Sequence, residues 1–131
     1  MVMQVYYFTR TGRSKAIAEE LAARYCTTAK EIADDVDWQG AGGYIKAGYK
    51  AFRGEALPAR YKKPDDKEEL ILVFPVWTGT FPPAVRTFLE KEGRARVILL
   101  PTSIGSKLKD RDGFAKIIDL VGKKISAPVS I

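Results

Sequence analysis

The fold is decided by residues 2–25, which read VMQVYYFTRTGRSKAIAEELAARY. The opening VMQVYYF is rich in β-branched and aromatic residues and ends at a loop with threonine and glycine, a pattern that predicts a strand. From Ser14 onward the period changes, because Ile17, Leu21 and Tyr25 form one apolar stripe at helical spacing. The stretch therefore predicts a strand, a tight turn and a helix.

The rest of the chain continues this alternation. Further strands are predicted at residues 28–33, 70–76, 97–100 and 125–131. Further helices are predicted at residues 44–52, from Pro83 to a stop at Gly93, and from Phe114 to Val121 with Gly122 closing it. The two central apolar strands suit a parallel sheet covered on both faces, and the short 28–33 strand suits a sheet edge. Much of the segment between residues 34 and 69 stays undecided.

Strands that alternate with helices pack as an open parallel α/β sheet with right-handed crossovers. Ligands of such sheets bind at the carboxyl ends of the strands. This rule selects three loops as the candidate site, at residues 9–14, 77–82 and 102–109.

Length and composition exclude several classes of protein. The 131 residues, 46% of them hydrophobic and 29% charged, fit one globular domain over residues 1–131. The longest apolar run, residues 70–77, is far shorter than the ~20 residues of a membrane-spanning helix. The N-terminus lacks the pattern of a signal peptide, so we expect a cytoplasmic protein without membrane contact. With no histidine and one cysteine, Cys26, the chain predicts neither a disulfide nor a His/Cys metal site.

The chain is basic, with a net charge of +6 and a pI near 9.5. Such a charge suits nucleic acid, anionic ligands or an acidic partner. Because no run of basic residues is interleaved with aromatic ones, we expect no nucleic-acid binding.

The first of the three loops has the residues of a phosphate site. It consists of Thr9, Arg10, Thr11, Gly12, Arg13 and Ser14. Unpaired N–H groups and the positive end of the helix dipole favour an anion at this helix start, hydroxyls can donate to phosphate oxygens, and glycine permits close approach. The alternative is that Thr11 or Ser14 only caps the helix. The loop is neither a Walker loop nor a Gly-x-Gly-x-x-Gly dinucleotide loop.

Residues 9–14, TRTGRS, match the pattern Thr/Ser-x-Thr-Gly-x-Thr/Ser, and here the sequence resembles the flavodoxin-like family, whose first loop binds the phosphate of FMN. A second match is PVWTGT at 75–80, followed by FPPAVRTFL at 81–89, which is similar to the family's isoalloxazine loop and the next helix. The segment GYIKAG at 43–48 also resembles a segment of some flavodoxin-like oxidoreductases. The resemblance covers most of the chain. It implies a three-layer, doubly wound, five-stranded parallel sheet in the order 2-1-3-4-5.

The resemblance also implies FMN as the cofactor. The implied contacts beyond the first loop are Pro75, Val76, Trp77, Thr78, Gly79, Thr80, Thr102, Ser103 and Gly105. Trp77 directly follows an apolar strand, where its indole can stack on a planar ring; the alternative is that it packs at the rim. No metal and no catalytic side chain are expected, because the flavin would perform the redox chemistry.

Three features depart from the family. The third loop, TSIGS at 102–106, lacks the aromatic residue that many flavodoxins place over the ring. Electron-carrier flavodoxins are typically acidic, whereas this chain is basic. The sequence also stops where the family has a last helix, which would leave one sheet face half uncovered and favours a homodimer through that face.

The leading hypothesis is an FMN-binding redox protein that transfers electrons through bound flavin to a protein partner. One alternative is an NAD(P)H-dependent FMN oxidoreductase acting on a quinone or similar small molecule. Another is a flavin-free, flavodoxin-like interaction module, which the missing aromatic residue and the missing helix favour.

Overall fold

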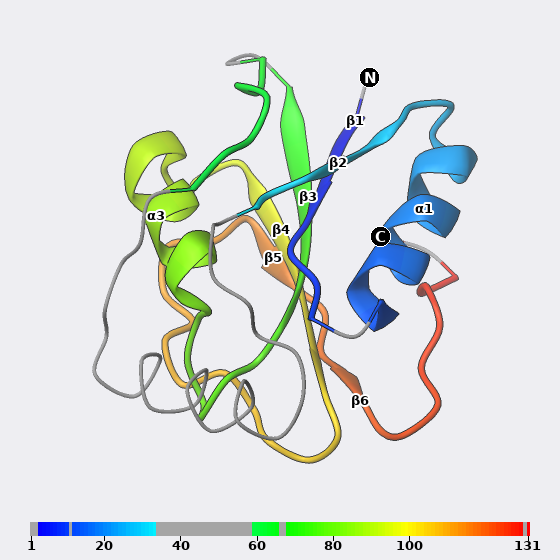
Figure 1. Cartoon of the computed structure of the whole chain (residues 1–131), viewed down its shortest axis with the longest axis vertical. Coiled ribbons are helices and arrows are strands. Elements are labelled where there is room, and N and C mark those ends of the chain that lie inside the picture. Colours follow the sequence, from blue (N-terminus) through cyan, green and yellow to red (C-terminus); the bar gives the residue numbers. More distant parts are fainter. Residues whose placement is uncertain (1–2, 11, 34–58, 66–67, 130) are drawn as a thin grey trace.

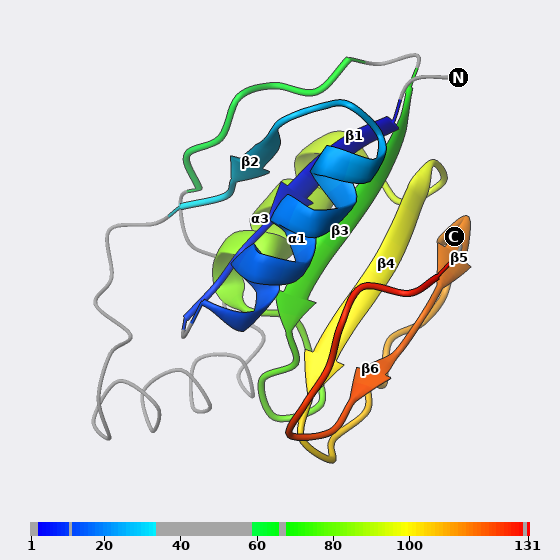
Figure 2. The same cartoon turned by 90° about the vertical axis from the view of Figure 1, so that its right-hand side faces the viewer.

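A parallel sheet with a helix on each side forms the centre of the molecule (Figures 1 and 2). The computed structural model describes residues 3–10, 12–33, 59–65, 68–129 and 131. The strands are β1 Met3–Tyr7, β2 Ala29–Glu31, β3 Glu69–Pro75, β4 Val97–Ser103, β5 Lys116–Ile117 and β6 Leu120–Val121. The helices of the described residues are α1 Arg13–Arg24 and α3 Pro83–Glu92.

The strand order is β2-β1-β3-β4-β5, with every neighbouring pair parallel and β6 also paired with β4. This is the predicted order 2-1-3-4-5, and the predicted fold class is confirmed. β2 lies at the sheet edge, as its short, mixed sequence indicated. The predicted helix at 44–52, and the rest of 34–58, lie outside the described residues.

The side chains of the central strands alternate between two apolar clusters, as the pleat of a strand requires. Tyr6, Leu72 and Leu99 point to the α3 side, where Val85 and Phe88 of the helix cover them. On the other side, a second cluster packs beneath α1, and its members include Val5, Val73, Leu100, Ile17 and Leu21. Buried on both faces, these strands explain the continuous apolar runs of the sequence.

The predicted helix from Phe114 to Val121 is wrong. The segment forms β5 and β6, which pair with β4 in one constant register, Leu99 with Ile117 and Thr102 with Leu120. Ile117 packs on the α3 side and Ile118 on the α1 side, so its apolar residues serve both faces of a sheet. These two short strands fill the fifth position of the sheet.

The predicted fifth strand at 125–131 is also wrong: the described residues there form no strand. The segment runs along the α1 side of the sheet instead (Figures 1 and 2). Ala127 is buried there, with Ile125 and Ile131 partly buried around it. Arg24 Nη1 donates to the Pro128 carbonyl at 2.5 Å, and the Ala127 N–H donates to Glu20 Oε2 at 3.3 Å. The segment thus covers part of the face that the sequence suggested was open.

At the amino ends of the strands, residues 62–65 are held to the sheet by polar contacts. Buried Gln4 donates to the Asp65 carbonyl at 3.1 Å and accepts from the Asp65 N–H at 2.8 Å. The hydroxyl of Tyr6 donates to the Lys62 carbonyl, and burial raises the pKa of this phenol to about 12. Neither helix of the described part of the chain has the length and apolarity to cross a membrane.

Candidate functional site

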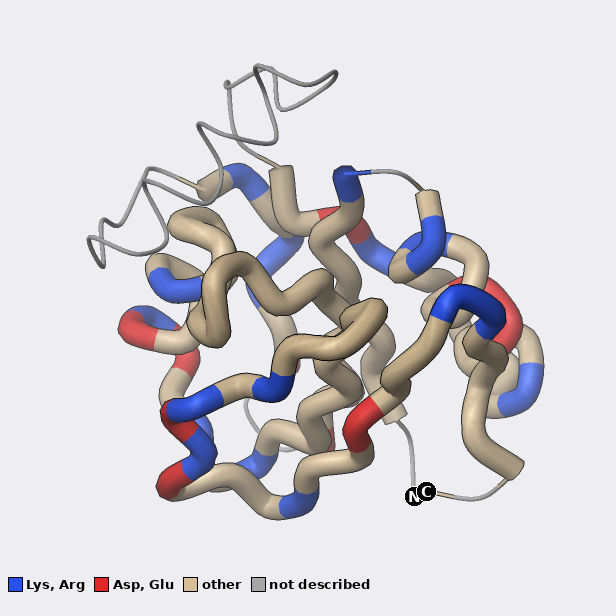
Figure 3. Tube along the Cα trace, turned by 90° about the horizontal axis from the view of Figure 1, so that it is seen from below, with Lys and Arg blue, Asp and Glu red and all other residues tan. Residues whose placement is uncertain are grey.

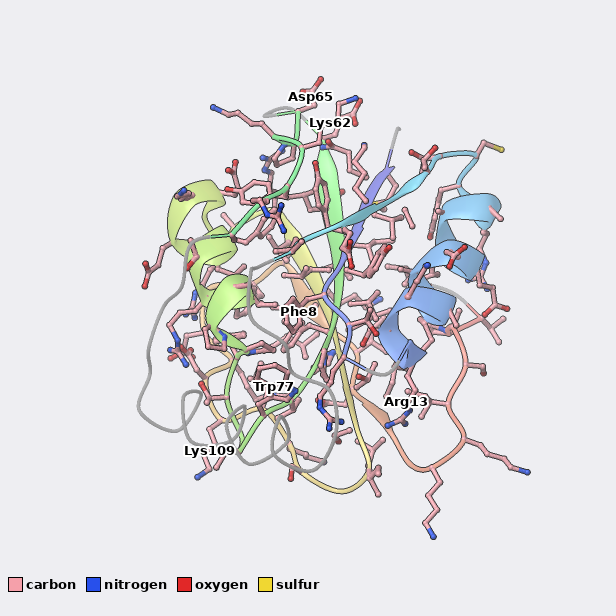
Figure 4. The ribbon with its side chains drawn as sticks, in the orientation of Figure 1. Phe8, Arg13, Lys62, Asp65, Trp77 and Lys109 are labelled. Carbon is pink, nitrogen blue, oxygen red and sulfur yellow. The ribbon has the colours of Figure 1, made fainter. Side chains whose placement is uncertain are left out.

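A pocket of about 280 Å³ lies at the carboxyl ends of β3 and β4, where the three predicted loops meet. Its lining residues are Arg10, Arg13, Pro75, Val76, Trp77, Thr102, Ser103, Ile104, Gly105 and Ser106. Figure 4 shows Arg13 and Trp77 at this end of the sheet and Lys62 and Asp65 at the other. The pocket is where the rule for open α/β sheets places a ligand.

The first loop turns tightly into α1. Gly12 has a φ of +95°, in the left-handed region that favours glycine, and its N–H donates to Thr9 Oγ1 at 2.8 Å. Thr9 thus braces the turn and does not line the pocket. No side chain of the described residues caps α1, so the positive end of its dipole is available to an anion. Thr11 lies outside the described residues.

Ser14 is buried and faces the sheet. Its Oγ lies 3.2 Å from Thr102 Oγ1, which in turn donates to the Phe74 carbonyl at 3.2 Å. The alternative that Ser14 caps the helix is not what the structure shows. The hydroxyl pair joins the start of α1 to the end of β4 beneath the pocket.

Two arginines of the first loop reach the pocket. Arg10 and Arg13 both line it, and Arg13 Nη2 donates to the Gly122 carbonyl at 2.6 Å. Arg13 therefore links α1 to the end of β6. Because a guanidinium has five N–H donors, Arg13 can make this bond and still present positive charge to the pocket.

The second loop is a tight hairpin. The N–H of Trp77 donates to the Thr80 carbonyl and that of Thr80 to the Trp77 carbonyl, both at 3.0 Å. Between them, Thr78 and Gly79 have φ values of +55° and +76°. Thr80 Oγ1 accepts from Arg86 Nη2 at 2.9 Å, so Thr80 serves the start of α3. Thr78, Gly79 and Thr80 do not line the pocket.

Trp77 has features of both interpretations that the sequence left open, because it packs against other side chains and also faces the pocket. It is only 8% exposed and belongs to the core on the α3 side, with its ring edge-on to Phe8 at a centroid distance of 5.4 Å. It also lines the pocket. Phe8 therefore fixes the position of the indole, which contributes a rigid wall to the pocket.

The third loop follows β4 and closes the other side. Ser103 Oγ donates to the Ser106 carbonyl, and the Lys109 N–H donates to the Gly79 carbonyl at 2.9 Å, which ties this loop to the second one. Ile104 and Ser106 line the pocket; the sequence placed their loop at the site but did not predict these two residues as contacts. Ile104 is 66% exposed; an apolar residue in a polar loop was the signal that could have found it.

Ion pairs anchor the segment after this loop. Arg94 forms a two-pronged pair with Asp110 at 2.8 and 2.9 Å, and Arg111 does the same with Asp119 at 3.1 and 2.7 Å. Hydrogen bonding to these guanidinium groups lowers the pKa of both carboxyls. The Arg94 guanidinium also lies 4.8 Å from the centroid of the Phe114 ring.

The sheet order and the place of the pocket define a doubly wound, flavodoxin-like α/β fold. Comparison with solved structures agrees. A flavoprotein from Lactobacillus acidophilus, crystallised in complex with FMN, superposes with a TM-score of 0.70 at 19% identity over 91% of each chain. Proteins assigned as flavoproteins from Bacteroides uniformis and Bacteroides eggerthii superpose with TM-scores of 0.70 at 23% and 19% identity, over 93% and 95% of this chain and 91% and 89% of theirs.

At these identities the likeness establishes the fold alone. No family model matches the sequence, and no curated protein is similar to it.

Proposed function

We propose that the chain binds FMN in this pocket and transfers electrons through the bound flavin. One observation carries the proposal: the three loops selected from the sequence line a single pocket. One side of that pocket is basic and adjoins a helix start, and another side is apolar. FMN also has two such parts, an anionic phosphate ester that suits the basic side and a planar ring that suits the apolar side.

The basic side fits the phosphate of FMN. The start of α1, which no side chain of the described residues caps, favours a doubly charged anion together with Arg10 and Arg13. Gly12 has a φ of +95° that would strain any residue with a Cβ, and the space beside its Cα is open, with no atom within 4 Å of where a Cβ would lie. In this proposal the phosphate approaches the backbone there. In this proposal Ser14 holds the loop in place through Thr102 and does not contact the phosphate directly.

The apolar side fits the isoalloxazine ring. Val76, Trp77 and Ile104 offer apolar surface, and the indole is held rigidly by Phe8. The third loop, which carries an aromatic residue in many flavodoxins, offers the aliphatic Ile104 to the pocket here. Bound FMN would supply the redox chemistry, while the residues of the pocket would bind it, exclude water from one side and set the electrostatic field.

The test compares FMN with riboflavin, which lacks the phosphate. We expect FMN to bind and its fluorescence to be quenched by Trp77. We expect Thr11→Ala to weaken FMN binding by about tenfold, the scale of one lost hydrogen bond to a charged group. Its affinity for riboflavin should stay unchanged. The control is Thr28→Ala, an exposed threonine at the other end of α1.

Absence of FMN binding by the wild-type chain would refute the proposal and favour the interaction module. Equal losses for FMN and riboflavin would refute the assignment of the phosphate loop.

The source of the electrons distinguishes an electron carrier from an NAD(P)H-dependent enzyme. We propose a carrier that exchanges electrons with a redox protein. NADPH or NADH added without oxygen should therefore leave the bound flavin oxidised, as followed by its visible absorbance. Rapid bleaching would instead favour an oxidoreductase that passes electrons from NAD(P)H to a quinone-type acceptor.

A further inference from the structure

The carboxyl end of the sheet carries much of the positive charge of the molecule. Its loops, at 9–14, 77–82 and 102–113 together with residues 118–124, contain Arg10, Arg13, Lys107, Lys109, Arg111, Lys123 and Lys124. Their acidic residues are Asp110, Asp112 and Asp119. Seven basic and three acidic residues leave a net charge of +4 out of +6 for the whole chain. Figure 3 looks onto this end and shows Lys and Arg around the loops.

The two ion pairs of this part of the described chain engage arginines and not lysines. Asp110 forms an ion pair with Arg94, which lies between α3 and β4, and Asp119 forms one with Arg111. Lys107, Lys123 and Lys124 are all exposed. A field of one sign at the mouth of a pocket attracts groups of the opposite sign.

An apolar spot lies among these lysines. Ile104 is 66% and Val121 45% exposed, and both are among the three exposed large hydrophobic residues of the described chain. Their backbones are neighbours, because Val121 pairs with Ser103, the residue before Ile104. An apolar centre inside a charged rim is the anatomy of a protein–protein interface.

We propose that this surface, defined by Ile104, Val121, Lys107, Lys123 and Lys124, docks an acidic redox protein. The inference rests on the proposed function, since the surface adjoins the pocket assigned to FMN and docking there would bring the partner to the flavin. Charge complementarity would steer the encounter, and the two aliphatic side chains would be buried in the complex.

The composition of the surface favours a protein over other anionic partners. The exposed large hydrophobic residues of the described chain are aliphatic, so the described part of this surface offers no large aromatic side chain on which nucleic-acid bases could stack. Ile104 and Val121 come from a loop and a short strand, whereas a membrane surface is typically bound by an amphipathic helix.

The experiment measures electron transfer to two haem proteins of opposite charge. FMN-loaded protein is photoreduced without oxygen and mixed with ferric cytochrome b5, which is acidic, or ferric cytochrome c, which is basic. One electron passes from the reduced flavin to each ferric haem, which becomes ferrous. The variant is Lys123→Glu with Lys124→Glu. The matched control is Lys62→Glu with Lys63→Glu, which changes the net charge equally at the opposite end of the sheet (Figure 4).

We expect the rate with cytochrome b5 to fall about tenfold between about 10 and 200 mM salt, because screening weakens the attraction. At low salt the Lys123/Lys124 variant should be about fivefold slower and the control pair within about twofold of wild type. Val121→Ser should slow the reaction at high salt as well, where the apolar contact remains. Cytochrome c should show the opposite salt dependence.

Equal effects of the two variant pairs would overturn the proposal, because net charge alone would then explain the rates. So would a faster reaction with cytochrome c at low salt, or binding of duplex DNA or phosphatidylserine vesicles in preference to cytochrome b5. Calorimetry of flavin-free protein with cytochrome b5 separates the two hypotheses. Salt-dependent binding that Lys123→Glu/Lys124→Glu abolishes, in a chain that takes up no FMN, would support the docking surface and refute the proposed function.

Discussion

Among single residues, Gly79 has the most restricted environment near the site. Its φ of +76° is unfavourable for any residue with a Cβ, and a Cβ there would lie 3.0 Å from Lys109 Cε. We expect Gly79→Ala to lower the free energy of unfolding by about 1–2 kcal/mol, mainly from the left-handed backbone, since the flexible lysine can move away. Urea unfolding measures the loss.

Gly105→Ala is the matched control for this substitution. Gly105 lies in the third loop, and a Cβ there would meet no atom within 4 Å. The free energy of unfolding of the Gly105→Ala variant should stay within about 0.5 kcal/mol of that of the wild type, as for most surface substitutions. Equal losses for the two variants would show that the hairpin at Gly79 does not impose the strain.

The residues of the site were predictable where a general rule fixes their place. The four pocket residues Arg10, Arg13, Trp77 and Ser103 lie at the ends of strands or in the loops that follow them, so the rule for parallel sheets brings them to one edge. The hydrogen bond between Ser14 and Thr102 joins residues that are 88 positions apart. No local pattern encodes such a contact, and therefore the sequence could not show that Ser14 faces the sheet.

Among the elements, the segment after the third loop depends on the pair between Arg94 and Asp110. Arg94 lowers the pKa of the Asp110 carboxyl below its ordinary value of 3.8, so the pair stabilises the fold above that pH and the contribution is lost as the pH falls through the lowered pKa. The side chains are 33% and 47% exposed, which limits the gain to about 0.5 kcal/mol.

We therefore expect Asp110→Asn to destabilise the protein by about 0.5 kcal/mol at neutral pH and by progressively less as the pH falls below 3.8, measured by urea unfolding across this pH range. The control is Asp112→Asn. It keeps the backbone carbonyl of Asp112 that accepts from Arg94, and it removes a nearby negative charge without breaking the two-pronged pair, so it measures the general electrostatic effect on Arg94. A loss at low pH as large as at neutral pH would contradict the ion-pair explanation.

The C-terminal segment carries a prediction about self-association. Residues 125–131 cover apolar surface beside α1, including the neighbourhood of Ala127. Deletion of these residues should expose that surface and increase association between copies of the chain. Sedimentation velocity over a range of concentrations measures it, with Arg24→Ala as a milder variant that loses only the contacts to Pro128 and Val129. A homodimer of the full chain through this face stays a prediction.

A truncated chain that sediments as a strict monomer at every concentration would contradict this role of the segment. The control is Val129→Ser in the full chain. Val129 is almost fully exposed, so its substitution changes the segment without uncovering the face.

Among the described residues, the elements were predicted well up to β4 and wrongly after it, while the helix predicted at 44–52 stays a prediction. Strands β1, β3 and β4 are buried on both faces, and helix α3 begins at Pro83 and ends before Gly93, so each has a strong local signal. Residues 114–121 have apolar positions at helical spacing. The same positions serve both faces of a sheet, because Ile117 packs on one side and Ile118 on the other. Only pairing with β4 decides between the two, and that contact is not local.

For the whole molecule, the positive charge predicts the redox behaviour of bound FMN. Reduction adds negative charge to a flavin, so a basic protein stabilises the reduced form and raises its potential. One charge at about 10 Å contributes about 0.4 kcal/mol in water, and the net +4 near the pocket therefore shifts the potential by several tens of mV. We expect a less negative hydroquinone potential than that of acidic flavodoxins, measured by spectroelectrochemistry.

The dependence of the potential on salt distinguishes the effect of the surface charges from that of contacts inside the pocket. Raising the ionic strength from about 10 mM to 1 M shortens the screening length from about 30 to 3 Å, so the potential should become more negative by a similar several tens of mV. Hydrogen bonds to the ring would be unaffected, because they act at contact distance. Lys123→Glu with Lys124→Glu should lower the potential at low salt and converge with wild type at high salt. A potential as low as that of acidic flavodoxins, or one independent of salt, would show that the surface charge does not set it.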